Sequence, residues 1–152
     1  MLESGDLQQH IFQTLQPSYS RRYQSMISSI EQHLLPRGVT LPQTNREVIG
    51  GYFIWFTLPT PLEAEKVAMI AKRDQNLIIA PGSIFGVYGD EGAVDLSRKV
   101  RVCFSWEDEH RLAEGIERLG QVIARMQRNR SQDTVGEGPL SNNSNALTEK
   151  YR

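Results

Sequence analysis

The sequence has little cysteine, no excess of charge and no long hydrophobic run. A single cysteine, Cys103, in 152 residues excludes an internal disulfide and a cysteine-rich zinc site. With 17 basic and 18 acidic residues the net charge is −1, so neither nucleic acid nor an anionic membrane is an expected partner. No apolar stretch approaches the roughly 20 residues that span a bilayer, and the N-terminal MLESGDLQQH lacks the layout of a signal peptide. We therefore expect a soluble, cytoplasmic protein.

The common catalytic motifs are also missing. The chain contains no P-loop, no GxGxxG and no HExxH. Its histidines, His10, His33 and His110, fall at mostly polar positions of predicted helices, which indicates surface residues and no metal site. Cys103 has apolar neighbours on both sides and no histidine nearby in sequence, so we expect a buried, structural thiol in a strand. Taken alone, the residues indicate only a small soluble domain.

Hydrophobic periodicity predicts two long helices. Apolar residues recur every three or four positions between residues 6 and 35, and Pro36 and Gly38 end that helix. Pro17 inside it either kinks the helix or begins a second one. A second amphipathic pattern runs from the acidic residues 107–109 to about residue 130. After residue 131 the composition turns to Ser, Asn, Gly and Glu, which predicts a disordered tail over 131–152.

Short strands and one more helix lie between the long helices. The strongest strand signal is Tyr52–Leu58, and further strands are expected at 39–41, 77–80 and 100–105. Pro61 is expected at the first position of a helix that runs from Leu62 to about Asp74. This order predicts an α+β fold, in which a small mixed or antiparallel sheet packs against the long N-terminal helix (1–35) and the C-terminal helix.

One charged residue does not fit a purely structural interpretation. Arg101 lies within an apolar strand, on the same side as Cys103 and opposite to Val100 and Val102. A guanidinium there can bind a carboxylate in bidentate fashion, because its planar fork matches that group. Two structural alternatives remain open: an edge-strand arginine that points to water, or one that pairs with an Asp or Glu.

Three segments resemble the small domain of fold-type-I, class I/II aminotransferases, which depend on pyridoxal 5′-phosphate (PLP). They are the glycine–aromatic strand Gly50–Trp55, the loop Ala80–Gly86, which is similar to the family's P-G-S-x-F, and the strand Val100–Ser105, which is similar to its Arg-hydrophobic-x-Phe-Ser. The first helix resembles the helix that links the large and small domains. The match runs in order from about residue 6 to 128, and is nearest to the branch of aromatic, 2-aminoadipate and kynurenine aminotransferases. It implies that residues 36–130 form the C-terminal small domain.

The resemblance implies a role for three residues in amino acid metabolism. Arg101 takes the position of the arginine that binds the substrate's α-carboxylate, and Ser83 and Phe85 line the substrate entrance. Substrates in the family are an amino acid and a 2-oxo acid, and the family's enzymes are commonly homodimers. In the structural alternative for the loop, Gly82 supports a turn and Phe85 packs in the core.

The same resemblance implies that this chain lacks the catalytic centre. The family's PLP-binding lysine belongs to the large domain, and Lys66, Lys72, Lys99 and Lys150 match no such motif. We therefore expect an aminotransferase fragment that neither binds PLP nor transaminates alone. The alternative is a non-catalytic module that binds a full-length aminotransferase or dimerises. A regulator with an aminotransferase-like domain is disfavoured, because the chain shows no helix-turn-helix segment and no basic patch.

Overall fold

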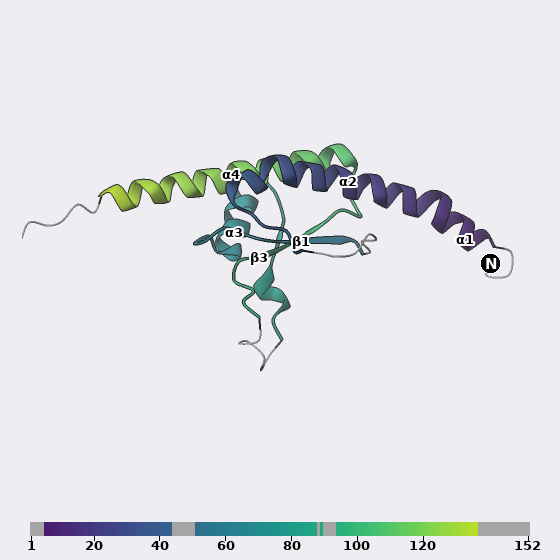
Figure 1. Ribbon diagram of the computed structural model, residues 1–152, viewed down its shortest axis with the longest axis horizontal. Coiled ribbons are helices and arrows are strands. Elements are labelled where there is room, and N and C mark those ends of the chain that lie inside the picture. Colours follow the sequence, from purple (N-terminus) through teal and green to yellow (C-terminus); the bar gives the residue numbers. More distant parts are fainter. Residues whose placement is uncertain (1–4, 44–50, 88, 90–93, 137–152) are drawn as a thin grey trace, which may run out of the picture.

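Two long helices lie side by side over a small sheet in the computed structural model, which describes residues 5–43, 51–87, 89 and 94–136 (Figure 1). The first helical run consists of α1 (Asp6–His10), a π-helical turn (Ile11–Leu15) and α2 (Gln16–His33). A 3-10 turn (Leu35–Arg37) follows and ends at Gly38, whose φ of 84° favours glycine. Pro17 therefore lies in the first turn of α2, directly after the π-helical turn, and the helical run continues through it.

In the described part of the chain, the sheet has three antiparallel strands in the order β1–β3–β2. Strand β3 (Lys99–Cys103) is central, with β1 (Phe53–Thr57) on one side and the short β2 (Ala80–Pro81) on the other. The expected strand at 39–41 contributes only one bridge, between Thr40 and Thr57, and residues 77–79 are irregular. The predicted α+β fold, with its small sheet packed against the long N-terminal and C-terminal helices, is confirmed.

The third helix begins later than the sequence predicts. Helix α3 spans Ala64–Gln75, and Pro61 precedes it in a cis peptide bond with Thr60. The prediction that Pro61 opens the helix is wrong, because residues 59–62 form a turn in which the Leu62 N–H donates to the Pro59 carbonyl at 2.9 Å. The buried Leu62 side chain fixes this turn to the core.

The last helix, α4, is the longest and spans Glu109–Gly136. Its start is capped by the Asp108 carboxylate, which accepts a hydrogen bond from the Arg111 backbone N–H at 2.9 Å. The helix continues into the segment predicted to be a tail, and residues 137–152 lie outside the described part of the chain.

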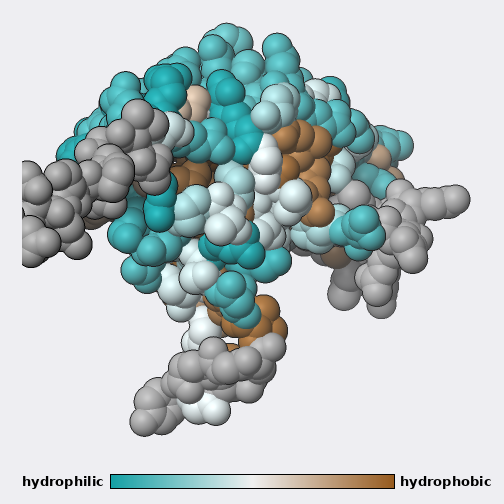
Figure 2. All heavy atoms as spheres, turned by 60° about the vertical axis from the view of Figure 1, so that its left-hand side comes forward, coloured by the Kyte–Doolittle hydropathy of each residue, from teal (hydrophilic) through white to brown (hydrophobic). Residues whose placement is uncertain are grey.

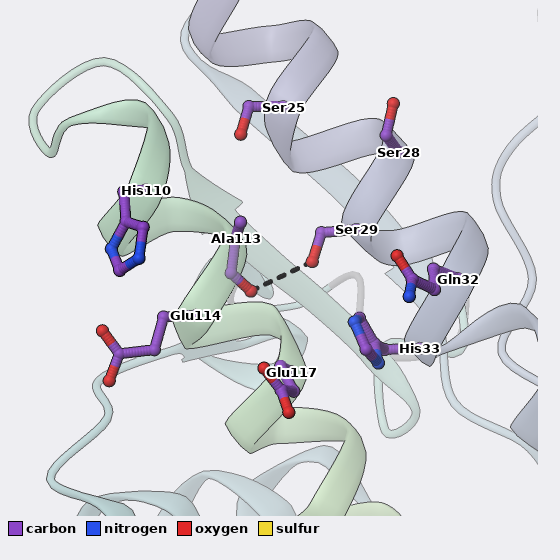
Figure 3. Close-up of a pocket in the computed structure, with 9 residues that line it drawn as sticks. All are labelled: Ser25, Ser28, Ser29, Gln32, His33, His110, Ala113, Glu114 and Glu117. Atoms are coloured by element: carbon purple, nitrogen blue, oxygen red, sulfur yellow. Dashed lines mark hydrogen bonds between the residues drawn. The ribbon is translucent and has the colours of Figure 1, made fainter.

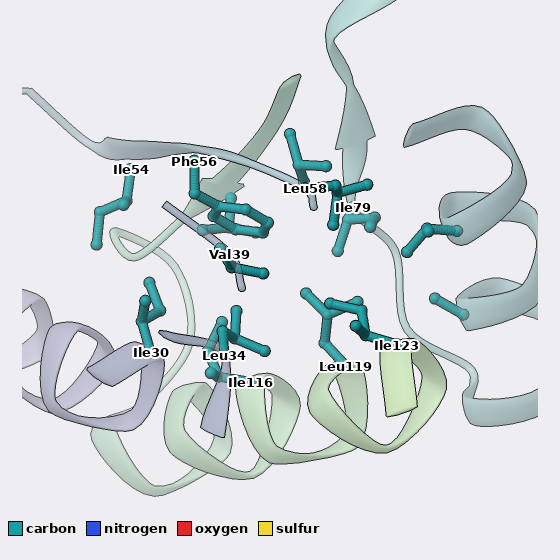
Figure 4. Packing of buried hydrophobic residues seen from close by; sticks show 14 of the residues in the cluster. Ile30, Leu34, Val39, Ile54, Phe56, Leu58, Ile79, Ile116, Leu119 and Ile123 are labelled. Atoms are coloured by element: carbon teal, nitrogen blue, oxygen red, sulfur yellow. The ribbon is translucent and has the colours of Figure 1, made fainter. Parts of the chain in front are cut away.

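The hydrophobic core lies between the sheet and the α2–α4 pair (Figure 4). Alternation along β1 and β3 turns Ile54, Phe56, Val100 and Val102 toward the helices, and all four are buried. The helices contribute further buried side chains, among them Ile30, Leu34, Ile116, Leu119 and Ile123. Since one face of the sheet is used by this core, the side chains between these positions must lie on its other face.

Candidate functional site

The second face of the sheet, which we call the outer face, carries the residues of functional interest. On β3 it presents Lys99, Arg101 and Cys103, which alternate with the buried Val100 and Val102. The facing positions on β1 belong to Phe53, Trp55 and Thr57, which pair with Cys103, Arg101 and Lys99 in that order. The outer face therefore combines two cations with aromatic side chains.

Arg101 lies at the centre of the outer face. It pairs with Trp55 on one side and with Ala80 on the other, so it is not on an edge strand. Its Cζ atom lies 4.0 Å from the centroid of the Phe53 ring and 4.0 Å from that of the Phe85 ring. Within the part of the chain that the structure describes, no Asp or Glu forms an ion pair with Arg101 and no hydrogen-bond acceptor is recorded for its guanidinium. The N–H groups are thus not consumed by a structural partner.

Phe85 reaches Arg101 because a 3-10 turn (Gly82–Phe85) lies close against β3. A Cβ atom on Gly82 would lie 2.6 Å from the Leu96 carbonyl oxygen and 2.8 Å from the Lys99 Cβ, so only glycine allows this approach. The Phe85 ring also makes an edge contact with Trp55, with 5.2 Å between ring centroids and 69° between planes. Phe85 accordingly packs on the outer face and is absent from the buried core.

Ser83, the third predicted site residue, is engaged elsewhere. Its hydroxyl donates a hydrogen bond to Glu65 Oε1 in α3 at 2.7 Å. Both side chains are exposed, and the contact ties the 3-10 turn to the helix behind it. The structure therefore brings Phe85 to Arg101, together with Phe53, and leaves Ser83 on the α3 side of the loop.

Cys103 is exposed, which contradicts the prediction of a buried thiol. The physical reason is the two-residue repeat of a strand: its neighbours Val102 and Phe104 are buried, and Cys103 points the opposite way. Its Sγ atom lies 3.1 Å from the Ser105 hydroxyl.

The histidines belong to the helical side of the molecule. His33 and His110 line a shallow groove of about 360 Å³ between α2 and α4, together with serine and glutamate side chains (Figure 3). The groove is crossed by a structural hydrogen bond in which the Ser29 hydroxyl donates to the Ala113 carbonyl at 3.0 Å. His10 is exposed on α1. No three metal-binding side chains gather anywhere in residues 5–43, 51–87, 89 and 94–136.

The lysines of the described residues lie on the surface of α3 and on the outer face of the sheet. Lys66 is exposed on α3 and pairs with Glu63 at 3.0 Å, and Lys72 is exposed on the same helix. Lys99 donates to the Thr57 hydroxyl at 2.9 Å on the outer face. Each of these amines is thus either exposed to solvent or engaged by a neighbouring side chain. Lys150 lies outside the described residues.

Two carboxylates are held in their charged form away from Arg101. Hydrogen bonds from the guanidinium groups of Arg73 and Arg125 lower the pKa of Asp74 to about 2, and this cluster ties α3 to α4. Hydrogen bonds from Ser97, with the nearby charge of Lys99, lower the pKa of Asp95.

None of the helices in the described part of the chain is long and apolar enough to cross a membrane.

Comparison with known proteins identifies the architecture. The chain is 34% identical over 122 residues to an uncharacterised protein of Saccharomyces cerevisiae, and 28% identical over 124 residues to aromatic-amino-acid aminotransferase 1 of Thermococcus litoralis. Each match covers 80% of this chain and 26% of the relative. The crystal structure of kynurenine aminotransferase from Pyrococcus horikoshii superposes with a TM-score of 0.68 at 28% identity, over 82% of this chain and 28% of that one. No protein-family model matches the chain.

These matches agree in extent and in kind. The chain spans about a quarter of the length of the relatives that it matches. In that quarter it resembles aminotransferases in both sequence and fold, in keeping with the small domain of the fold-type-I, PLP-dependent enzymes.

Proposed function

We propose that this chain, as an aminotransferase small domain, supplies the arginine that binds the substrate's α-carboxylate during amino-group transfer between an amino acid and a 2-oxo acid. The observation that carries the proposal is the position of Arg101, which is central in the sheet, contacted by two phenyl rings and without an acidic partner among the described residues. A guanidinium that is held in place while its N–H groups remain free suits bidentate capture of a carboxylate at about 2.7–2.9 Å.

Every amino acid and 2-oxo acid carries this carboxylate, so a fixed arginine fork can orient either substrate in the same way. Orientation of a reacting bond is a large part of catalysis by proximity. Phe85 would border the bound carboxylate, because its ring already contacts Arg101. Ser83 would line the entrance only after its hydroxyl left Glu65, so its proposed role is weaker than that of Phe85.

PLP would supply the electron-withdrawing group for the reaction, and it would be held by residues outside those described here. We propose that the 152-residue chain alone neither binds PLP nor transaminates, because its described lysines are solvated or occupied. Assembly as a homodimer and a cytoplasmic location are further parts of the proposal, carried over from the resemblance.

The proposal can be tested on the chain by itself. Pyruvate, a 2-oxo acid, is titrated into isotope-labelled protein while the Arg101 Nε–H signal is followed by NMR. Arg101→Lys keeps the charge and removes the fork, and we expect it to weaken binding about tenfold or more. Arg111→Lys, an exposed substitution on α4, serves as the matched control. Equal affinity of the wild type and Arg101→Lys would remove the basis of the assignment.

The second candidate function is a non-catalytic binding or dimerisation module. The observation in its favour is exposed hydrophobic surface, visible in Figure 2 among the polar side chains. Ile78, Ile84 and Trp106 are 82%, 64% and 86% exposed, and a partner that covered them would remove this apolar surface from water. Size-exclusion chromatography separates the candidates, since a stable monomer at micromolar concentration argues against self-association through these residues.

A further inference from the structure

The two rings that contact Arg101 come from opposite sides of the central strand. Phe53 belongs to β1, and Phe85 ends the turn that follows β2, while β1 and β2 flank β3 on its two sides. Both ring centroids lie 4.0 Å from the Arg101 Cζ atom, which is within cation–π range. Trp55, on β1, makes an edge-to-face contact with the Phe85 ring.

This arrangement restricts Arg101 without using its hydrogen-bond donors. An arginine side chain loses considerable rotamer freedom when a ligand immobilises it, and a side chain already held in place loses less. An acidic partner would also hold the guanidinium but would occupy the N–H groups that a ligand needs. The two phenyl rings approach within 4.0 Å of the Cζ atom without accepting a conventional hydrogen bond, so the N–H donors stay available.

The rings also limit the shapes of anion that can bind. A carboxylate is planar and can lie in the plane of the guanidinium, between the two rings. Sulfate and phosphate are tetrahedral, so with two oxygens in that plane the others project toward the ring faces. Those faces carry negative electrostatic potential and repel oxyanions.

We propose that Phe53 and Phe85 form a clamp that positions Arg101 and makes its site select planar carboxylates over tetrahedral oxyanions. The inference rests on the proposed function, because it assumes that Arg101 is the anion-binding group. It adds Phe53 as a positioning residue that determines ligand class.

The test compares acetate with sulfate at equal ionic strength, with dissociation constants measured by NMR on the wild type, Phe53→Leu and Phe53→Tyr. Phe53 is 43% exposed, so its ring can be removed without opening the core. We expect Phe53→Leu to weaken acetate binding about three- to tenfold through loss of pre-organisation. The ratio of the sulfate to the acetate dissociation constant should fall about threefold, because the Phe53 ring no longer repels the sulfate oxygens. Phe53→Tyr keeps the ring and should restore both values.

Phe12→Leu provides the matched control, because Phe12 is 64% exposed on the π-helical turn and no contact with Arg101 is recorded for it among the described residues. If Phe53→Leu behaves like Phe12→Leu while Arg101→Lys abolishes binding, the clamp is refuted and the proposed function stands. If the wild type binds sulfate as tightly as acetate, the selectivity is refuted whatever the variants show. If acetate does not bind at Arg101 at all, both proposals fail.

Discussion

Replacement of Gly82 by alanine should separate the loop that carries Phe85 from the central strand. The added Cβ would lie 2.6 Å and 2.9 Å from the carbonyl oxygens of Leu96 and Lys99, and 2.8 Å from the Lys99 Cβ. Two of these atoms are backbone oxygens. Lys99 belongs to β3, and the Leu96 carbonyl accepts a hydrogen bond from the Lys99 N–H at 3.1 Å, so neither oxygen can turn away as a flexible side chain would. The 3-10 turn must therefore move.

The expected loss of stability is about 1–3 kcal/mol, the usual range for overpacking at a buried site. Against a total of roughly 5–15 kcal/mol for a domain, this is readily measured by urea unfolding. With a slope of about 1–3 kcal/mol per molar urea, the midpoint should fall by about 1 M. In NMR spectra, the Arg101 side-chain signals should also lose the ring-current shift that the nearby Phe85 ring causes.

Gly86→Ala is the matched control within the same loop. Its φ of −62° and ψ of 138° suit alanine, and its nearest contact would be the Ser83 carbonyl oxygen at an acceptable 3.4 Å. We expect it to be neutral or to stabilise by about 0.4–1 kcal/mol, because the unfolded chain loses freedom. Equal stability of Gly82→Ala and Gly86→Ala, with the Phe85–Arg101 contact intact in both, would refute the reasoning.

Three further predictions concern the core, the α3–α4 contact and the cofactor. Leu119→Ala removes a fully buried side chain of α4 and should destabilise by about 2–5 kcal/mol in urea unfolding. The pKa of Asp74 is lowered from 3.8 to about 2, so its contribution to stability is present above pH 3.8 and is lost as the pH falls toward 2. The free energy of unfolding, measured at a series of pH values between 3.8 and 2, should therefore fall less in Asp74→Asn than in the wild type. Identical dependence on pH in the two proteins would contradict this prediction. Finally, the chain incubated with PLP should show no absorbance band of an imine between PLP and a lysine. A lysine adduct found by mass spectrometry after borohydride reduction would contradict the proposal.

The regular parts of the fold were predictable from periodicity. Apolar residues every three or four positions placed the long helices, and the aromatic run Tyr52–Leu58 placed β1, because these patterns reflect burial on one face of an element. The two-residue alternation of β3 places Cys103 on the same face as Arg101, so its exposure was predictable. The prediction of a buried thiol instead rested on its apolar neighbours in sequence. The start of α3 depended on a turn at Pro59–Leu62 that no local pattern specifies.

The candidate site was predictable only in part. Alternation along β3 indicated the face of Arg101, and the aminotransferase-like loop indicated Phe85. Phe53 was missed as a contact of Arg101, because the two residues lie far apart in sequence and meet only through the antiparallel register of β1 and β3. The hydrogen bond from Ser83 to Glu65 was likewise beyond reach, because it depends on how the 3-10 turn packs on α3.

The most direct test of a carboxylate-binding Arg101 is a crystal structure of the chain with pyruvate. We expect two carboxylate oxygens in the plane of the guanidinium at about 2.7–2.9 Å from its nitrogens, between the rings of Phe53 and Phe85. A well-ordered pyruvate bound elsewhere, with the Arg101 guanidinium turned to an acidic side chain or to solvent, would contradict it.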